Sequence, residues 1–434
     1  MKSPVLSILF LLISVTLLAV PNDFRFRHFS VEDGLSSNSV RAIMQDKYGF
    51  LWIGTEEGLN RYDGIMIKSY SICPQAAGKY ISSLYGTKKN IWIGTDEGIY
   101  IYAYATETFT YFDLTTPNNV RITSIVNHIL QDKDGNLWFS TNGQGLFRYN
   151  LSKNYLEQYE FTSAFGIVAS TMADSDNQIW ALTNQGESGV YKLNKAENKF
   201  EPFGLLYNAG NHHSQALAML EDSEQTLWLG TWECGLQKID KYTRQTTTYL
   251  HPTDGKGVTH IHSLMEYAPH QLLIGSDDGL LLFNTLTEEY KLFTENETVP
   301  NSLSNRFVYP IIKDREGGIW IGTYYGGINY ISPNAEQFES FSHSRLYNSI
   351  NGNVIGRFCE DAHGQIWIAS DDGGLNRYSP KDRKFVYYLP ADHKNSLSYH
   401  NVHALCMDGD NLWIGTYTRS EERRVGKECL RLCR

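Results

Sequence analysis

The chain has 434 residues, a formal net charge of −10 and an aromatic content of 13%, with 28 tyrosines and 9 tryptophans. This length exceeds one ordinary domain, and the abundance of aromatic residues and glycine favours many short strands over a helical bundle. The acidic balance argues against a surface that attracts phosphate backbones, so we expect no nucleic-acid binding by this segment. The six cysteines follow no metal-ligand spacing, and we expect neither a metal site nor a cofactor.

The chain begins with an apolar segment. Lys2 precedes a stretch from Val5 to Val20, whose length suits the core of a signal peptide better than a membrane span of about 20 residues. We therefore expect residues 1–21 to be an export signal and the mature protein to be periplasmic. An uncleaved anchor is the alternative, because the residues before Pro21 lack a clear small-x-small cleavage pattern.

A motif of Trp, an apolar residue, Gly and Thr recurs with variations along the rest of the chain, at intervals of 40–48 residues. A four-stranded unit repeated at this period is typical of a β-propeller blade. We expect the Trp to pack between neighbouring blades and the Gly to let the next sheet approach closely. Leu273 takes the first position in one copy. The tryptophans in this position are Trp52, Trp92, Trp138, Trp180, Trp228, Trp320, Trp367 and Trp413.

Two further residue types keep a fixed distance from this Trp position. An Asp lies six residues before it in six copies, and we interpret its side chain as a turn stabiliser that bonds backbone groups. These residues are Asp46, Asp132, Asp174, Asp222, Asp314 and Asp361. A Gly six residues after the position should take the positive φ of a tight turn. These glycines are Gly58, Gly98, Gly186, Gly279, Gly326 and Gly373.

The order of the units predicts an all-β fold in two parts. Segment 24–29 reads as a fourth strand with no first three before it, and we expect it to complete the blade that ends near Ile331. A second such start lies at 337–341. We therefore predict a seven-bladed β-propeller of four-stranded antiparallel blades over 22–333, followed by the first two blades of a second, truncated propeller over 334–417.

The repeat stops after Thr416. Residues 418–434 contain six basic and three acidic residues, and neither the period nor the composition continues. We expect this segment to be a non-repeat tail, disordered or foreign to the protein. A genuine basic tail is the alternative.

The segments Asp46–Tyr62 and Asp361–Tyr378 resemble the two-component regulator propeller repeat, in which Asp-x-x-Gly-x-x-Trp-Ile-Gly-Thr precedes Gly-Leu-x-x-Tyr. The second segment has Ala369 and Ser370 in place of the Gly and Thr. The resemblance covers roughly residues 24–416. It implies the periplasmic sensor region of a hybrid two-component receptor, and many receptors of this family detect oligosaccharides.

The resemblance also implies a homodimeric full-length receptor anchored in the inner membrane and carrying a histidine kinase module. That module is absent here, so we do not expect this chain to be an enzyme by itself. Its contact with the membrane would be limited to the signal or anchor segment or to missing C-terminal parts.

Ligand-binding candidates lie in the turns between second and third strands and in the connections between blades, which share one face of an up-and-down propeller. Aromatic rings bind the apolar faces of sugars, and polar groups bind their hydroxyls. Trp232 is the one Trp outside the repeated position, so blade packing does not explain it. The proposed ligand-binding residues are Trp232, Glu233, Tyr324, Tyr325, His212 and Arg306. The same segments also contain Glu56, Glu57, Asn142, Gln144, Asp277, Asp278, Asn211, His213 and His260.

The alternative function is a secreted β-propeller enzyme that acts on polysaccharide as a lyase or hydrolase. We predict no catalytic residues, because the repeated Asp residues are equivalents and a glycosidase needs one unequal carboxylate pair. His260 and His262 can place two imidazoles on one strand face, but no third residue at suitable spacing completes a metal site.

Overall fold

A computed structural model describes residues 24–72, 79–161, 166–183, 189–204, 215–252, 257–296, 299, 301–333, 341, 343, 348–392 and 396–417, and the backbone of 420–424 and 430–432. The described fold is all-β, and the chain divides into two compact units, Met1–Thr294 with Asn301–Ala335 and Glu295–Pro300 with Glu336–Arg434. None of the described segments is a helix long and apolar enough to cross a membrane. The predicted export signal over 1–21 lies outside the described residues.

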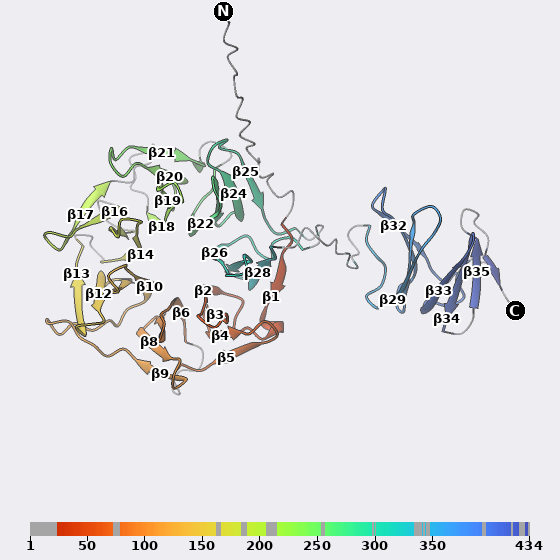
Figure 1. Ribbon diagram of the computed structural model, residues 1–434, viewed down its shortest axis with the longest axis horizontal. Coiled ribbons are helices and arrows are strands. Elements are labelled where there is room, and N and C mark those ends of the chain that lie inside the picture. The colour runs from red at the N-terminus through yellow and green to blue at the C-terminus, as the bar shows by residue number, and fades with distance from the viewer. Residues whose placement is uncertain are drawn as a thin grey trace, which may run out of the picture. The chain divides into compact units, whose positions relative to one another are not determined.

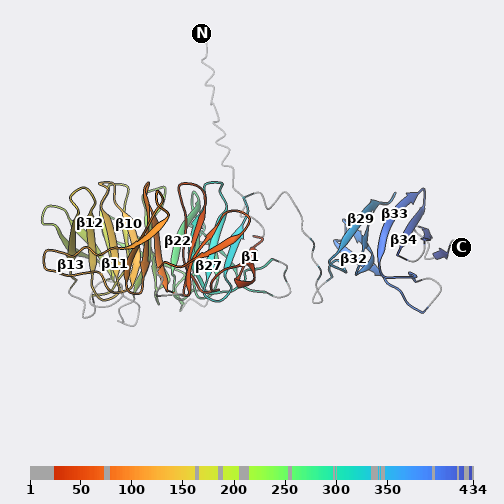
Figure 2. The ribbon, with the colours of Figure 1, turned by 90° about the horizontal axis from the view of Figure 1, so that it is seen from below.

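The described residues of the first unit form seven four-stranded antiparallel sheets around one axis (Figure 1). The strands run along that axis, so the turns gather at two opposite ends (Figure 2). Six sheets use four consecutive strands. They are β2 (Val40–Gln45), β3 (Leu51–Thr55), β4 (Gly58–Tyr62), β5 (Ile67–Tyr70); β6 (Ile81–Gly86), β7 (Asn90–Thr95), β8 (Gly98–Ala103), β9 (Thr108–Tyr111); β10 (Val126–Gln131), β11 (Leu137–Thr141), β12 (Leu146–Asn150), β13 (Tyr155–Tyr159); β14 (Val168–Ala173), β15 (Ile179–Thr183), β16 (Val190–Asn194), β17 (Lys199–Gly204); β18 (Ala216–Glu221), β19 (Leu227–Thr231), β20 (Leu236–Ile239), β21 (Thr246–Tyr249); and β22 (Ser263–Ala268), β23 (Gln271–Gly275), β24 (Leu280–Asn284), β25 (Tyr290–Phe293).

The seventh sheet joins the two ends of the unit. It contains β26 (Val308–Lys313), β27 (Ile319–Thr323), β28 (Ile328–Ile331) and, as its outer strand, β1 (Arg27–Phe29). Phe29 is 5% exposed, and its ring stacks on Trp320 with 5.6 Å between centroids. The predicted closure of the ring by segment 24–29 is therefore confirmed. A 3-10 turn, η1 (Val31–Asp33), then leads the chain into the first sheet.

The repeated Trp fills the space between adjacent sheets, as predicted. Trp52 is 1% exposed and packs in one cluster with Ile81 and Tyr102 of the next sheet. A Cβ added at Gly54 would lie 2.5 Å from the Cγ2 atom of Ile81. The small residue of the motif is therefore needed for the close approach of the two sheets.

The repeated Asp does more than stabilise its turn. The Oδ1 atom of Asp46 accepts the N–H groups of Tyr48 at 2.9 Å and Phe50 at 3.0 Å, and its Oδ2 atom accepts the indole N–H of Trp52 at 2.8 Å. The carboxylate thus joins the turn to the buried indole, a link that the sequence analysis missed. The same bond, at 2.7–2.9 Å, joins Asp132 to Trp138, Asp174 to Trp180, Asp222 to Trp228, Asp314 to Trp320 and Asp361 to Trp367.

The predicted glycine turns are correct where the turn is short. Gly58, Gly98 and Gly279 have φ values of 144°, 111° and 138°. The prediction is displaced by one residue at Gly326 and Gly373, because those turns are one residue longer and the positive φ falls on the next glycine, at 71° and 74°. Gly186 lies outside the described residues.

The described residues of the second unit form two sheets of the same strand order. The strands are β29 (Ile355–Glu360), β30 (Ile366–Ser370), β31 (Gly374–Ser379), β32 (Lys384–Tyr388); and β33 (Val402–Asp408), β34 (Asn411–Thr416), β35 (Ser420–Arg424), β36 (Leu430–Leu432). Their assignment to a second propeller stays a prediction, and the expected start at 337–340 lies outside the described residues.

The expectation of a non-repeat tail over 418–434 differs from the structure. The backbone of β35 pairs with β34, with Ser420 opposite Gly415, and β36 pairs with β35. These segments take the third and fourth places of a blade. The physical reason is that the free edge of β34 presents backbone N–H and C=O groups that an adjoining segment can satisfy.

Candidate ligand-binding site

The first strands of the sheets lie nearest the axis of the first unit, and each contacts the first strand of the next sheet (Figure 1). A register shift recurs near the start of these strands, between Val40 and Ala42 in β2 and between Val308 and Ile311 in β26. Such a bulge changes the direction of the side chain within it. The bulges in β2 and β26 contain Arg41 and Tyr309–Pro310, and both Arg41 and Tyr309 belong to one contact network.

One half of this network is built on an aspartate between two imidazoles. The Oδ2 atom of Asp277 lies 2.5 Å from Nδ1 of His260, and its Oδ1 atom lies 2.8 Å from Nε2 of His262. The ring of Trp232 lies against His260, with 3.9 Å between centroids. The opposite imidazole, His262, stacks on Tyr309 at 4.2 Å and 12°. A single carboxylate therefore fixes two rings, each of which holds an aromatic side chain.

The other half is built on a partly buried ion pair. The Nη2 atom of Arg41 lies 2.5 Å from Oε1 of Glu56, and the guanidinium carbon lies 4.3 Å from the ring centroid of Tyr324 and 4.8 Å from that of Tyr309. The side chain of Arg41 is 16% exposed. We call the full set the axial cluster. It consists of Arg41, Glu56, Trp232, His260, His262, Asp277, Tyr309 and Tyr324.

The electrostatics of the axial cluster keep its charged groups charged. Burial opposes ionisation of Asp277, but the hydrogen bonds from His262 and His260 outweigh it and hold the pKa of that carboxyl below its usual range. Burial likewise works against the charge of Arg41, yet the neighbouring Tyr80 and Glu56 raise its pKa. Burial raises the pKa of Tyr309, which stays a neutral phenol. The cluster therefore presents one carboxylate and one ion pair in fixed positions.

The residues predicted to bind ligand fall into three groups. Trp232 and Tyr324 belong to the axial cluster, and Tyr325, which is 64% exposed, packs edge-on against Tyr324 at 4.4 Å. Glu233 and Arg306 are exposed beside the cluster, and Arg306 lies over the ring of Phe307. His212 lies outside the described residues, as do Asn211 and His213.

Several other candidates have structural roles. The Oε1 atom of Gln144 accepts the N–H groups of Thr123 and Ser124, and Oδ2 of Asp278 accepts the N–H of Thr259 at 2.8 Å. These side chains hold the connections between blades. The backbone N–H groups of Asn142 and Glu57 are likewise used within the fold. Among the described residues, no group of three or more His, Cys, Asp or Glu is arranged to hold a metal ion.

The sequence analysis missed Arg41 and Tyr309, and it considered His262 only as a metal ligand. A signal was present, because all three lie eleven residues before the repeated Trp or Leu of their own blade. In the structure, Arg41 and Tyr309 lie within the bulges near the start of their first strands. His262 occupies the equivalent position, directly before Ser263 at the start of β22. The position varies from blade to blade, so it did not register as part of the repeat.

Comparison with known proteins identifies the repeat. The model of the two-component regulator propeller family matches residues 34–57, 121–143, 302–325, 349–372 and 396–418. Histidine kinase P4 of Formosa agariphila is 46% identical over 68 residues, which are 16% of this chain and 5% of that kinase. These matches show the repeat type in the five matched segments.

Similar solved structures share the arrangement of sheets. The extracellular domain of a hybrid two component system from B. thetaiotaomicron is 26% identical with a TM-score of 0.62, and the match covers 93% of this chain and 53% of that one. A second such domain is 22% identical with a TM-score of 0.62, covering 94% and 59%, and shows likeness of fold alone. Streptogramin B lyase is 16% identical with a TM-score of 0.55. The match covers 71% of this chain and 97% of the lyase, and it also shows likeness of fold alone.

The present chain spans about half the length of the first of these extracellular domains. The chain is thus an all-β protein with five segments that match the two-component regulator propeller family, and it is similar to the extracellular domains of hybrid two-component systems.

Proposed function

We propose that this chain is the periplasmic ligand-sensing region of a hybrid two-component receptor, and that it binds an oligosaccharide at the axial cluster. The observation that supports this proposal is the network of aromatic rings and fixed charges around Asp277 and Arg41. The similarity to extracellular domains of hybrid two-component systems supports the sensor role. The oligosaccharide is the inference from the chemistry of the cluster.

The axial cluster has both kinds of group that a sugar requires. Trp232 of the cluster is 36% exposed, and Tyr325, which packs against Tyr324 of the cluster, is 64% exposed, so ring surface is accessible for the apolar C–H face of a pyranose. Asp277 and the Arg41–Glu56 pair supply acceptors and donors for hydroxyl groups. Because existing hydrogen bonds hold these groups in place, little side-chain entropy is lost when a ligand binds.

Calorimetry with a panel of oligosaccharides tests the proposal. The double variant Trp232→Ala/Tyr324→Ala should weaken binding by at least about tenfold, because both rings belong to the proposed contact surface. Tyr242→Ala is the matched control, since that ring is 87% exposed in the turn between β20 and β21, away from the axis. Circular dichroism reports whether each variant is folded. Unchanged affinity in a folded double variant would remove this site.

The enzymatic alternative makes a separate prediction. A secreted lyase or hydrolase would release new reducing or unsaturated ends from polysaccharide, whereas the proposed sensor leaves the polymer intact. The likeness to streptogramin B lyase is one of fold alone and does not favour this alternative. We also propose that the full receptor acts as a homodimer, which cross-linking of the membrane-bound protein would test. A ligand signals only if it binds two receptor arrangements with different affinity.

A further inference from the structure

In several blades the same two side chains occupy the space beside the repeated Trp, an Asp and a basic residue, and we call this pair the common filling. In the third sheet, Asp132 accepts the indole N–H of Trp138, and Arg148, directly opposite Trp138 in the strand register, places its guanidinium carbon 5.6 Å from the indole. A basic residue takes this opposite position in four other blades. These residues are Arg61, Lys192, Lys238 and Arg377, which lie over Trp52, Trp180, Trp228 and Trp367.

The second sheet, β6–β9, lacks both parts of this filling. Thr87 takes the position that Asp occupies in six other sheets. Its N–H donates to the carbonyl of Asn90, just as the N–H of Asp46 donates to the carbonyl of Phe50. Ile101 lies opposite Trp92 in place of the basic residue. Trp92 is 3% exposed, and its Nε1 atom has no hydrogen-bond partner among the described residues. A buried N–H without an acceptor is unfavourable, so an acceptor placed there would be favourable.

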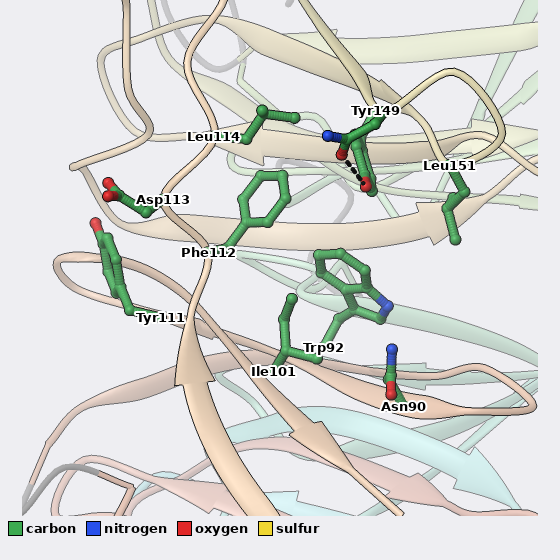
Figure 3. A pocket seen from close by; sticks show the side chains of 10 residues that line it. Asn90, Trp92, Ile101, Tyr111, Phe112, Asp113, Leu114, Tyr149 and Leu151 are labelled. Carbon is green, nitrogen blue, oxygen red and sulfur yellow. Dashed lines mark hydrogen bonds between the residues drawn. The ribbon is translucent and has the colours of Figure 1, made fainter.

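A cavity of about 410 Å³ lies beside Trp92, and Ile101 is one of the residues that line it. The corresponding spaces beside Trp52 and Trp138, where Asp and Arg are present, measure about 240 and 170 Å³. Figure 3 shows Trp92 between Ile101 and Phe112, with its indole nitrogen on the side of Asn90. The larger volume falls in the range of about 300–1,000 Å³ that is common for small-molecule sites.

Three aromatic rings in this cavity contact one another. Trp92 and Phe112 lie 5.3 Å apart between centroids, Trp92 and Tyr149 lie 5.8 Å apart, and Phe112 and Tyr149 lie 5.1 Å apart. The hydroxyl of Tyr149 donates to Asn154 at 2.8 Å, which fixes that ring in place. The cavity therefore combines a rigid aromatic wall with an indole N–H that lacks an acceptor.

We propose that this cavity is a second binding site, which takes a neutral saccharide ring with an oxygen that accepts the Trp92 indole N–H. Its lining shares no residue with the axial cluster, so a test of this site does not depend on the function proposed above. Tyr149, the partly exposed ring of this wall, offers ring surface for the C–H face of a pyranose, and a ring oxygen or hydroxyl takes the place of the Asp carboxylate found in six other blades.

The charges of the lining residues favour a neutral ligand over an anionic one. Among its lining residues in the described chain, none is basic and Asp113 is acidic. The carboxylate of Asp113 already pairs with Arg121, with 2.8 Å between Oδ1 and Nε. An anionic sugar would leave its charge without a counter-ion in a partly desolvated space, which is unfavourable.

Nuclear magnetic resonance of the full chain with ¹⁵N-labelled tryptophan indoles tests the proposal. Trp92→Phe identifies the Trp92 indole signal. Titration with cellobiose, maltose and lactose should shift this signal in a saturable manner with at least one of the three. Digalacturonate, the charged comparison, should bind at least about tenfold more weakly. The proposal is overturned if none of the three neutral sugars shifts the signal, or if digalacturonate binds more tightly.

A variant that restores the common filling separates this site from any other sugar site. Thr87→Asp/Ile101→Arg supplies the carboxylate and guanidinium of the other blades and should weaken the response at Trp92 at least about tenfold. The matched control Ile101→Val keeps the cavity apolar and should retain the response. The Trp92→Phe variant, which retains an aromatic ring, should weaken binding measured by calorimetry. Full affinity in the filled variant would contradict the proposal even if sugars bind elsewhere on the chain.

Discussion

Replacing the repeated carboxylate should cost much more stability than its position in a surface turn suggests. Asp174 is 3% exposed, its Oδ2 atom accepts the indole N–H of Trp180 at 2.9 Å, and its Oδ1 atom accepts the N–H of Gln178 at 2.8 Å. Asp174→Ala leaves a buried indole N–H unsatisfied, at about 1–3 kcal/mol, and loses turn bonds worth about 1 kcal/mol. We therefore expect the free energy of unfolding to fall by about 2–4 kcal/mol.

Urea unfolding followed by circular dichroism measures this loss, and hydrogen exchange of β14 and β15 assigns it to the blade. Asp176→Ala is the control, since Asp176 is an exposed carboxylate in the same turn. Trp180→Phe removes the donor, so the double variant should show a coupling of about 1–2 kcal/mol with Asp174→Ala. If Asp174→Ala changes stability no more than Asp176→Ala does, the carboxylate–indole bond does not stabilise the blade.

Three further predictions concern packing and reactivity. Gly54→Ala should lower stability by about 1–3 kcal/mol, because the added Cβ meets Ile81 at 2.5 Å, and a thermal melt equal to that of the parent would contradict the packing argument. Phe29→Ala should cost about 3–5 kcal/mol and increase hydrogen exchange in the closing sheet first, since Phe29 is buried where β1 joins β28. At about pH 8, iodoacetamide should alkylate Cys406 well before Cys359, because burial raises the pKa of Cys359 to about 11, and mass spectrometry of the peptides would show equal rates if this were wrong.

Positions that recur in most blades could be predicted from the sequence. The Trp between sheets, the Gly that permits close approach and the N-terminal strand that closes the ring each follow from one pattern repeated at a 40–48-residue interval. The indole partner of the repeated Asp was also implicit, because its six-residue spacing from Trp was visible. Turn chemistry explained the Asp well enough that its second oxygen was not considered.

The axial cluster could not be predicted in the same way. Asp277 bonds to His260 and His262 across the β22–β23 hairpin, and Arg41 of the first sheet meets Tyr309 and Tyr324 of the seventh. These contacts depend on ring closure and on the bulges of the first strands, neither of which sets a sequence period. Trp232 was identified because it broke the pattern, and its neighbours were missed because their position has no fixed residue type.

Departures from the repeat are therefore more informative about ligand binding than the repeat itself. The Asp–Trp–basic residue arrangement stabilises a blade through local bonds and is equivalent from one blade to the next, so it carries no preference for a particular ligand. Where Thr87 and Ile101 replace two of its parts, the blade gives up those bonds and keeps a buried donor without an acceptor. A blade that lacks these residues and has no substitute for them within the chain is expected where a bound ligand supplies the missing hydrogen-bond acceptor. By this reasoning, and on the proposal of a second site, the blade containing Trp92 lacks a local bond that a bound ligand would supply.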